Sequence, residues 1–195
     1  MIKQSEYHLI LASASPRRKA LLQELGLAFE VIPAHIEELL LEHETALEHV
    51  RRLALEKGQK LAYDYPESWV ISSDTIVVLD NQILGKPKDE ADAKRILRAL
   101  SGRSHEVITA FSIQHSSRDI ELVEHEITEV HFRNLSDEDI EDYIASGSPM
   151  DKAGAYGIQD LDAYLVDRIN GSYHNVMGFP VAKFAQEWNR LLTGN

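Results

Sequence analysis

The chain has 195 residues, of which 44% are hydrophobic and 27% charged, as in an ordinary soluble globular domain. Its formal net charge of −12 opposes binding to polymeric nucleic acid or to an anionic membrane, and no apolar run approaches the ~20 residues that cross a bilayer. The chain has no cysteine, which excludes disulfides, thiolate zinc sites and cysteine nucleophiles. The N-terminal residues lack the basic-then-apolar order of a signal peptide, so we expect a cytoplasmic location.

Strands and helices alternate from the start of the pattern. We expect, in order, a strand over residues 8–12, a helix over 17–25, a strand over 29–33 and a long helix over 45–63. Pro16 suits a first helical turn, and Gly26 suits the cap that ends the same helix. The first strand therefore runs directly into a helix N-terminus.

The next segment carries a single acid in apolar surroundings. Residues 69–73 and 76–79 resemble two strands, and Asp74 and Thr75 break the pattern between them. This break predicts Asp74 at the C-terminal end of a buried strand, where open α/β sheets present their chemistry. A turn acid with no catalytic part would give the same local pattern.

The second half of the chain continues the alternation. A tight turn is expected at Asp80–Asn81, and the remaining elements are a helix over 89–100, strands over 106–114 and 120–133, a helix from Ser136 to Gly147, a strand over 164–169 and a helix over 180–192. No repeat or flexible linker interrupts them. The order predicts an α/β domain with a mixed, twisted sheet flanked by helices.

Two turns are suited to binding phosphate. The turn Ser13–Arg18 offers hydroxyls, free helix amides and two arginines, which together favour an anion; alternatively, Ser15 only caps the helix and both arginines face solvent. Lys86 lies in a Gly-Lys-Pro turn that restricts the backbone. Lys57 lies in the long helix, where a lysine is ordinarily solvated.

Oxygen ligands are available for a hard cation. Asp74 is the best candidate for a general base, and Glu37 or Glu38 could join it in holding Mg²⁺ together with substrate phosphates. Phosphate-loop, dinucleotide and zinc-protease motifs are absent, which removes the main support for ordinary kinase, dehydrogenase and metalloprotease functions.

Several ordered motifs make the chain resemble the Maf family of nucleotide pyrophosphatases almost from end to end. They are Leu9–Arg18, Ile36-Glu37-Glu38, Glu56-Lys57, Ser73-Asp74-Thr75, Gly85-Lys86-Pro87, Ser101-Gly102, Asp151–Gln159 and Asn170–Asn175. The resemblance implies one domain over residues 1–195, bilobed with a central cleft as in Maf and ITPase folds, and a homodimer. It also implies hydrolysis of nucleoside triphosphates to monophosphate and pyrophosphate with Mg²⁺ or Mn²⁺.

The resemblance assigns roles by position. Asp74 is expected to be the proton acceptor, with Glu38 and Asp74 at the metal and with phosphate contacts from Ser13, Arg18, Lys57 and Lys86. Residues Arg17, Thr75 and Gln159 match the branch that acts on dTTP and UTP, whereas the 7-methyl-GTP branch has Trp, Gln and Glu there. A glutamine amide can both donate to and accept from the edge of uracil or thymine. The alternatives are the 7-methyl-GTP preference and a nucleotide-binding regulator of cell division.

Overall fold

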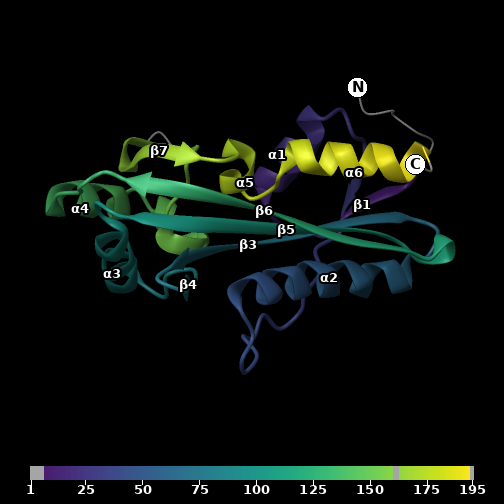
Figure 1. Cartoon of the computed structure of the whole chain (residues 1–195), viewed down its shortest axis with the longest axis horizontal. Helices are drawn as coiled ribbons and strands as arrows, with labels where there is room; N and C mark the ends of the chain where they lie inside the picture. Colours follow the sequence, from purple (N-terminus) through teal and green to yellow (C-terminus); the bar gives the residue numbers. More distant parts are fainter. Residues whose placement is uncertain (1–6, 160–162, 194–195) are drawn as a thin grey trace. The chain divides into compact units, whose positions relative to one another are not determined.

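A mixed sheet organises the structure, a computed structural model that describes residues 7–159 and 163–193. Within them the seven strands follow the order β2-β1-β3-β5-β6-β7, with β4 paired to β3 (Figure 1). The strands are β1 (Leu9–Leu11), β2 (Glu30–Val31), β3 (Trp69–Leu79), β4 (Gln82–Leu84), β5 (Ser104–His115), β6 (Ile120–Phe132) and β7 (Val166–Asn170). Strand β1 pairs in parallel with β2 and β3, whereas β4 and β7 pair antiparallel with β3 and β6. The predicted mixed sheet is confirmed.

The helices agree closely with the sequence pattern. They are α1 (Pro16–Glu24), α2 (Ala46–Asp64), α3 (Glu90–Leu100), α4 (Asp137–Ala145), α5 (Tyr173–Met177) and α6 (Val181–Thr193). Strand β4 and the short α5 were not expected. Across the described ranges, none of the helices has both the length and the apolar character needed to cross a membrane.

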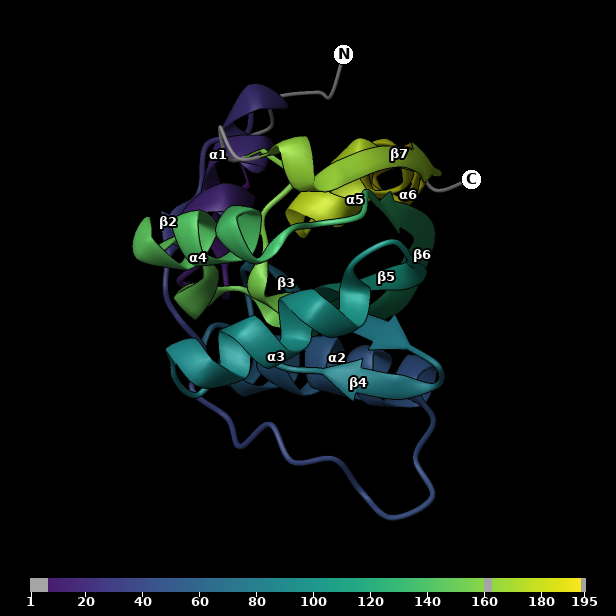
Figure 2. The same ribbon diagram turned by 90° about the vertical axis from the view of Figure 1, so that its left-hand side faces the viewer.

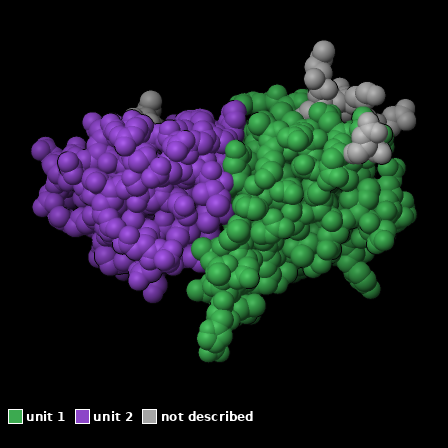
Figure 3. All heavy atoms as spheres, in the orientation of Figure 1, with its two compact units in different colours: residues 1–74, 109–126, 178–195 green, residues 75–108, 127–177 purple. Residues whose placement is uncertain are grey.

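The chain divides into two compact units, coloured separately in Figure 3. Unit 1 takes its described residues from 1–74, 109–126 and 178–195, and unit 2 takes its own from 75–108 and 127–177. Neither unit is one continuous stretch of chain. Strands β3, β5 and β6 each contribute residues to both units. Two units agree with the expected bilobed fold.

In unit 1, helix α2 covers one face of the sheet and helices α1 and α6 cover the other (Figure 1). Helix α2 approaches the sheet closely at Gly58, where a Cβ would lie 2.5 Å from both Ser112 Oγ and Gln114 Nε2. Ser112 Oγ also lies 2.6 Å from Ser72 Oγ, and both hydroxyls donate to the carbonyl of Ala54 in α2. This buried polar contact holds α2 against β3 beside Lys57.

In unit 2, helices α3 and α4 pack together and bury one apolar core with the sheet (Figure 2). Its largest side chains include Phe132, Tyr143 and Tyr156. Helix α4 begins at a capping box in which Ser136 accepts from the Asp139 amide and the Asp139 carboxylate accepts from the Ser136 amide, as the sequence predicts.

Strand β3 corrects one prediction. It runs without interruption through Asp74 and Thr75, so Asp74 lies inside a strand and not at the end of one. The break was inferred from a run of polar residues, but Ser72 and Ser73 are completely buried and both hydroxyls are hydrogen-bonded within unit 1. Polar residues whose hydrogen bonds are satisfied can continue a buried strand.

Candidate active site

Asp74 is a buried carboxylate between the two segments of β3 that pair with β1 and with β4. Its side chain is only 10% exposed. An ionised carboxylate at such a place needs a partner, because removing a lone charge from water is costly. The partner comes from the facing helix α2.

Lys57 joins two carboxylates. Its Nζ donates to Asp74 Oδ1 at 2.6 Å and lies 2.6 Å from Glu38 Oε1. The lysine side chain is 9% exposed, that of Glu38 54%. With all three groups ionised, this cluster carries one net negative charge. The ammonium donates one of its three N–H groups to Asp74, whereas its contact with Glu38 is an ion pair.

Arg18 supports the backbone next to Asp74. Its guanidinium donates to the carbonyls of Ser73 at 2.7 Å and of Gly178 at 2.9 Å, and to Ser13 Oγ at 3.3 Å. Loss of solvent lowers the pKa of Arg18 from its ordinary value, and the nearby charge of Asp74 opposes that change. The guanidinium stays charged, because arginine side chains are not deprotonated in proteins.

The structure of the turn before α1 bears on the two alternatives for Ser13–Arg18, an anion site or a simple helix cap. Ser15 caps the helix by accepting from the Arg18 amide at 3.4 Å, as the simpler interpretation predicts. Arg18 does not simply face solvent, however, because it bonds to two carbonyls of unit 1. Arg17 is half-buried on the same helix. Contact of either arginine with phosphate stays a prediction.

Unit 2 brings the Lys86 turn to the segment that ends in Gln159. The Gly154 amide donates to the Gly85 carbonyl at 3.1 Å, and Gly154 has a φ of 68°, with Val77 against its Cα. Lys86 is exposed, and no described residue forms an ion pair or hydrogen bond with it. The lysine is therefore available to an anionic ligand.

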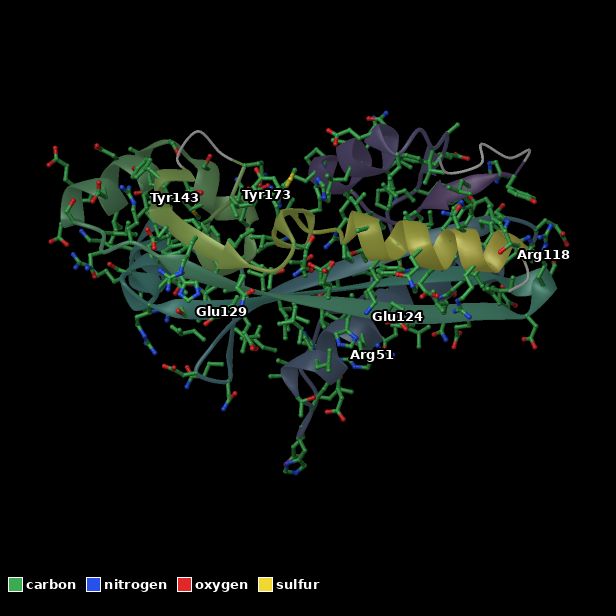
Figure 4. The ribbon with its side chains drawn as sticks, turned by 45° about the horizontal axis from the view of Figure 1, so that its top comes forward. Arg51, Arg118, Glu124, Glu129, Tyr143 and Tyr173 are labelled. Carbon is green, nitrogen blue, oxygen red and sulfur yellow. The ribbon has the colours of Figure 1, made fainter. Side chains whose placement is uncertain are left out.

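Two tyrosines hold the segment Asp151–Gln159. Tyr143, labelled in Figure 4, accepts from the Gly157 amide at 3.1 Å. Tyr156 OH lies 2.7 Å from His105 Nε2, and burial raises the pKa of this tyrosine. Burial also lowers the pKa of His105 to about 3, so the imidazole that hydrogen-bonds to the phenol is neutral. Neither His105 nor Tyr143 was singled out from the sequence.

Gln159 and Thr75 also belong to unit 2, and both are half-buried. The amide oxygen of Gln159 is buried and has no hydrogen-bond partner among the described residues. Buried polar atoms are nearly always paired, so this oxygen can accept from a donor that the described residues do not supply.

The predicted site residues thus fall into two groups. The structure brings together Ser13, Arg18, Glu38, Lys57 and Asp74 within unit 1, with Arg17 next along α1. Thr75, Lys86 and Gln159 are in unit 2. Glu37, the alternative to Glu38, forms no ion pair or hydrogen bond with Lys57 or Asp74 in the described part of the chain, whereas Glu38 contacts Lys57 directly.

The donor set fits a hard divalent cation that also binds phosphate. Glu38 and Asp74 are two carboxylates gathered at one ammonium group. No cluster of three or more His, Asp or Glu suited to a metal occurs in the part of the chain that the structure describes. Two carboxylates completed by substrate phosphates are the usual arrangement for Mg²⁺.

Comparison with known proteins shows what the chain resembles. A family model described as Maf-like protein matches residues 8–191. A dTTP/UTP pyrophosphatase of Clostridioides difficile (strain 630) is 48% identical over 90% of this chain and 91% of its own length. The dTTP/UTP pyrophosphatase of Geotalea uraniireducens (strain Rf4) is 46% identical over 96% of this chain and 97% of its own.

A solved structure shares the fold. The HAM1 protein from Coxiella burnetii superposes with a TM-score of 0.50 over 97% of this chain and 100% of its own, at 17% identity. At that identity the likeness concerns the architecture alone. It agrees with the expected Maf and ITPase-like α/β class.

Proposed function

Because this chain belongs to the Maf-like protein family, we propose that it hydrolyses dTTP and UTP to the monophosphate and pyrophosphate. The observation that carries this function is the match to relatives named dTTP/UTP pyrophosphatase, at 46% and 48% identity over 90% or more of both chains. The protein is accordingly a hydrolase that acts on acid anhydrides.

Asp74 is the proposed general base. The oxygen of a water molecule forms a bond to the α-phosphorus, the water proton passes to a carboxylate oxygen of Asp74, and the bond from the α-phosphorus to the bridging oxygen of the pyrophosphate breaks. Support comes from the position of the carboxylate. Lys57 orients it through Oδ1, and Arg18 fixes the adjacent carbonyl of Ser73.

Cationic side chains are the proposed phosphate ligands. Lys57 has three N–H groups and donates to Asp74, so it can also donate to a phosphate oxygen, and Lys86 is exposed on a turn fixed by Gly154. Ser13 and Arg18 complete the set that the family resemblance implies. Such groups offset the negative charge that develops on the departing pyrophosphate.

Glu38 and Asp74 are the proposed ligands of a divalent cation. Bound there with a triphosphate, Mg²⁺ or Mn²⁺ would supply positive charge at the phosphoryl oxygens. The chain's own part is to present two carboxylates from separate segments at one place, which Lys57 achieves by contacting both.

Arg17, Thr75 and Gln159 are the proposed determinants of base preference. The strongest support is the unpaired, buried amide oxygen of Gln159, which could accept the N3–H of uracil or thymine while the amide nitrogen donates to O4. A site built around such polar groups discriminates strongly against a base that leaves them unpaired.

One experiment tests the function. Pyrophosphate release is measured across dTTP, UTP, the other common nucleoside triphosphates and 7-methyl-GTP, with Mg²⁺ or Mn²⁺, for wild type and Asp74→Asn. We expect selective turnover of dTTP and UTP, and a loss on the order of 10²-fold or more in the variant. Equal turnover by both proteins would falsify the role of Asp74. Hydrolysis of 7-methyl-GTP but not of UTP would place the protein in the 7-methyl-GTP branch of the family. Nucleotide binding without hydrolysis would favour a regulator.

Three further expectations stay predictions. They are a single domain over residues 1–195, a homodimer and a cytoplasmic location. The first is tested by the unfolding experiment described in the Discussion, the second by the mass of the purified protein in solution, and the third by locating the protein in fractionated cells.

A further inference from the structure

The segment from Glu38 to Glu44 carries a proposed metal ligand but has little apolar anchorage. Leu39, Leu40 and Leu41 are 63%, 57% and 52% exposed. The segment lies in the extended connection between β2 and α2 that Figure 2 shows, and this connection stands out from the surface of unit 1 in Figure 3. Hydrophobic burial of these leucines therefore cannot hold Glu38 in place.

A polar clamp on α2 holds this segment instead. Arg52 donates from Nε to Glu44 Oε1 at 2.6 Å and from a terminal nitrogen to Glu44 Oε2 at 2.8 Å, a two-bond contact. The same terminal nitrogen donates to the Leu39 carbonyl at 2.8 Å. Two-bond contacts between arginine and carboxylate are among the strongest and most directional in proteins. One guanidinium thus fixes both ends of residues 39–44.

The clamp is itself supported. Glu44 is only 8% exposed at its side chain, accepts from the Leu41 amide at 3.1 Å and lies 3.0 Å from His49 Nδ1. The bond from Arg52 lowers the pKa of Glu44 to about 2. Glu56, one turn along α2, contacts the other side of the Arg52 guanidinium at 3.2 Å.

The geometry points to a positioning function, and this inference rests on the proposed metal-dependent hydrolysis. We propose that Arg52 and Glu44 hold the backbone next to Glu38, so that its carboxylate meets Asp74 at Lys57 and both can bind the cation. Arg52 fixes the Leu39 carbonyl, Lys57 contacts the Glu38 side chain, and both residues project from α2. The helix therefore controls the backbone and the side chain of the ligand from one rigid element.

The test measures metal affinity directly. Mn²⁺ binding is followed by electron paramagnetic resonance in the presence of a non-hydrolysable dTTP analogue, for wild type, Arg52→Gln and Glu44→Gln. Removing a partner of a metal ligand typically costs 10- to 100-fold in affinity, and we expect a loss of about that size in both variants. The Mn²⁺ concentration for half-maximal dTTP hydrolysis should rise in parallel, while kcat at saturating Mn²⁺ changes little.

Arg51→Gln is the matched control. Arg51 is the preceding residue of α2, and it contacts His125 Nδ1 at 3.0 Å instead of the segment. Figure 4 labels it beside Glu124 of β6. This variant should bind Mn²⁺ as wild type does. Arg52→Lys should recover only part of the affinity, because a lysine cannot reproduce the two-bond contact.

Other results would overturn the inference. Unchanged Mn²⁺ affinity in folded Glu44→Gln, or a lower kcat with unchanged affinity, means that the clamp does not act through Glu38. A loss of equal size in Arg51→Gln means that the effect is a general consequence of altering α2. If wild type itself fails to turn over dTTP in the presence of Mn²⁺, the proposed function is wrong independently of the clamp.

Discussion

Lys57 is a buried lysine whose position comes from tertiary packing. On a helix, a lysine between Glu56 and Gly58 would ordinarily be solvated, and only the family resemblance singled it out. In the structure Gly58 lets α2 approach β5, and the Ala54 carbonyl bonds to Ser72 and Ser112 of the sheet. Residues far apart in the sequence therefore place one ammonium group between two carboxylates, which a local pattern cannot reveal.

The contacts of Arg18, like those of Lys57, could not be predicted from a local sequence pattern. Its motif indicated a phosphate-binding arginine, but its carbonyl acceptors lie 55 and 160 positions away along the chain. Backbone carbonyls are identical in every residue type, so no sequence signal marks Ser73 or Gly178 as acceptors. The residue was predicted and its contacts were not.

Removing the Lys57 ammonium should leave the buried carboxylate of Asp74 without its ion-pair partner. Lys57→Met should lower the free energy of unfolding by about 2 kcal/mol, less than the roughly 3–5 kcal/mol for fully buried pairs because Glu38 is 54% exposed. The measurement is urea unfolding followed by circular dichroism. The double variant Lys57→Met with Asp74→Asn should regain part of that stability but no activity. Strict additivity of the two changes would show that the ion pair contributes nothing to folding.

At the scale of elements, caps and periodicity predicted most boundaries. Thr45 and Glu48 form a capping box before α2, Ser136 and Asp139 form another before α4, and both helices begin within one residue of expectation. Strand β4 was missed because three residues, Gln82–Leu84, are too few to show alternation. The break that was wrongly predicted in β3 has a different cause. Polar residues in the interior of this strand form hydrogen bonds that only the folded state supplies.

Gly154 ties the Lys86 turn to the Gln159 segment. A Cβ there would lie 2.7 Å from Val77 Cγ2, and the residue has a φ of 68°. Gly154→Ala should therefore incur both the left-handed backbone cost of about 1 kcal/mol and an overpacking cost of about 1–3 kcal/mol. Urea unfolding measures the stability, and we also expect a higher KM for dTTP.

Gly147→Ala separates these two costs. Gly147 has a φ of 73°, but nothing lies within 4 Å of the position its Cβ would take. This variant should be destabilised only by the left-handed backbone cost, and its KM for dTTP should not change. Equal destabilisation of the two variants would mean that Val77 yields without cost and that close packing at Gly154 does not fix the segment.

For the whole molecule, the fold class was predictable from the sequence, whereas the boundaries between the two units were not. Alternating strands and helices indicated one mixed α/β sheet, which the structure confirms. Three of the four unit boundaries fall inside strands β3, β5 and β6, where no change of composition, proline or glycine marks them, and only the fourth, at Gly178, lies between two helices. A boundary of this kind reflects which side chains share a core, and local patterns carry no such information.

The stability of the whole chain should depend on pH through His105. Burial lowers the pKa of His105 to about 3 in the folded state, whereas an unfolded histidine titrates near 6.5. The unfolded state therefore takes up a proton first, so this contribution is complete above about pH 6.5 and declines as the pH falls towards 3. Between pH 7 and 5 the loss is about 2 kcal/mol. The variant His105→Gln can still hydrogen-bond to Tyr156 but has no group that titrates in this range. The difference in free energy of unfolding between wild type and this variant should therefore shrink by about 2 kcal/mol from pH 7 to pH 5.

The two tryptophans let the same experiment test whether the chain is one cooperative domain. Trp69 and Trp188 are both in unit 1, whereas His105 is in unit 2. Because three strands run through both units, we expect them to unfold together, so that tryptophan fluorescence and circular dichroism give the same urea midpoint. The His105→Gln change should then shift the fluorescence midpoint although no tryptophan shares its unit. If the substitution leaves the fluorescence midpoint unchanged and the dichroism curve is biphasic, the two units unfold independently, which would contradict the single domain.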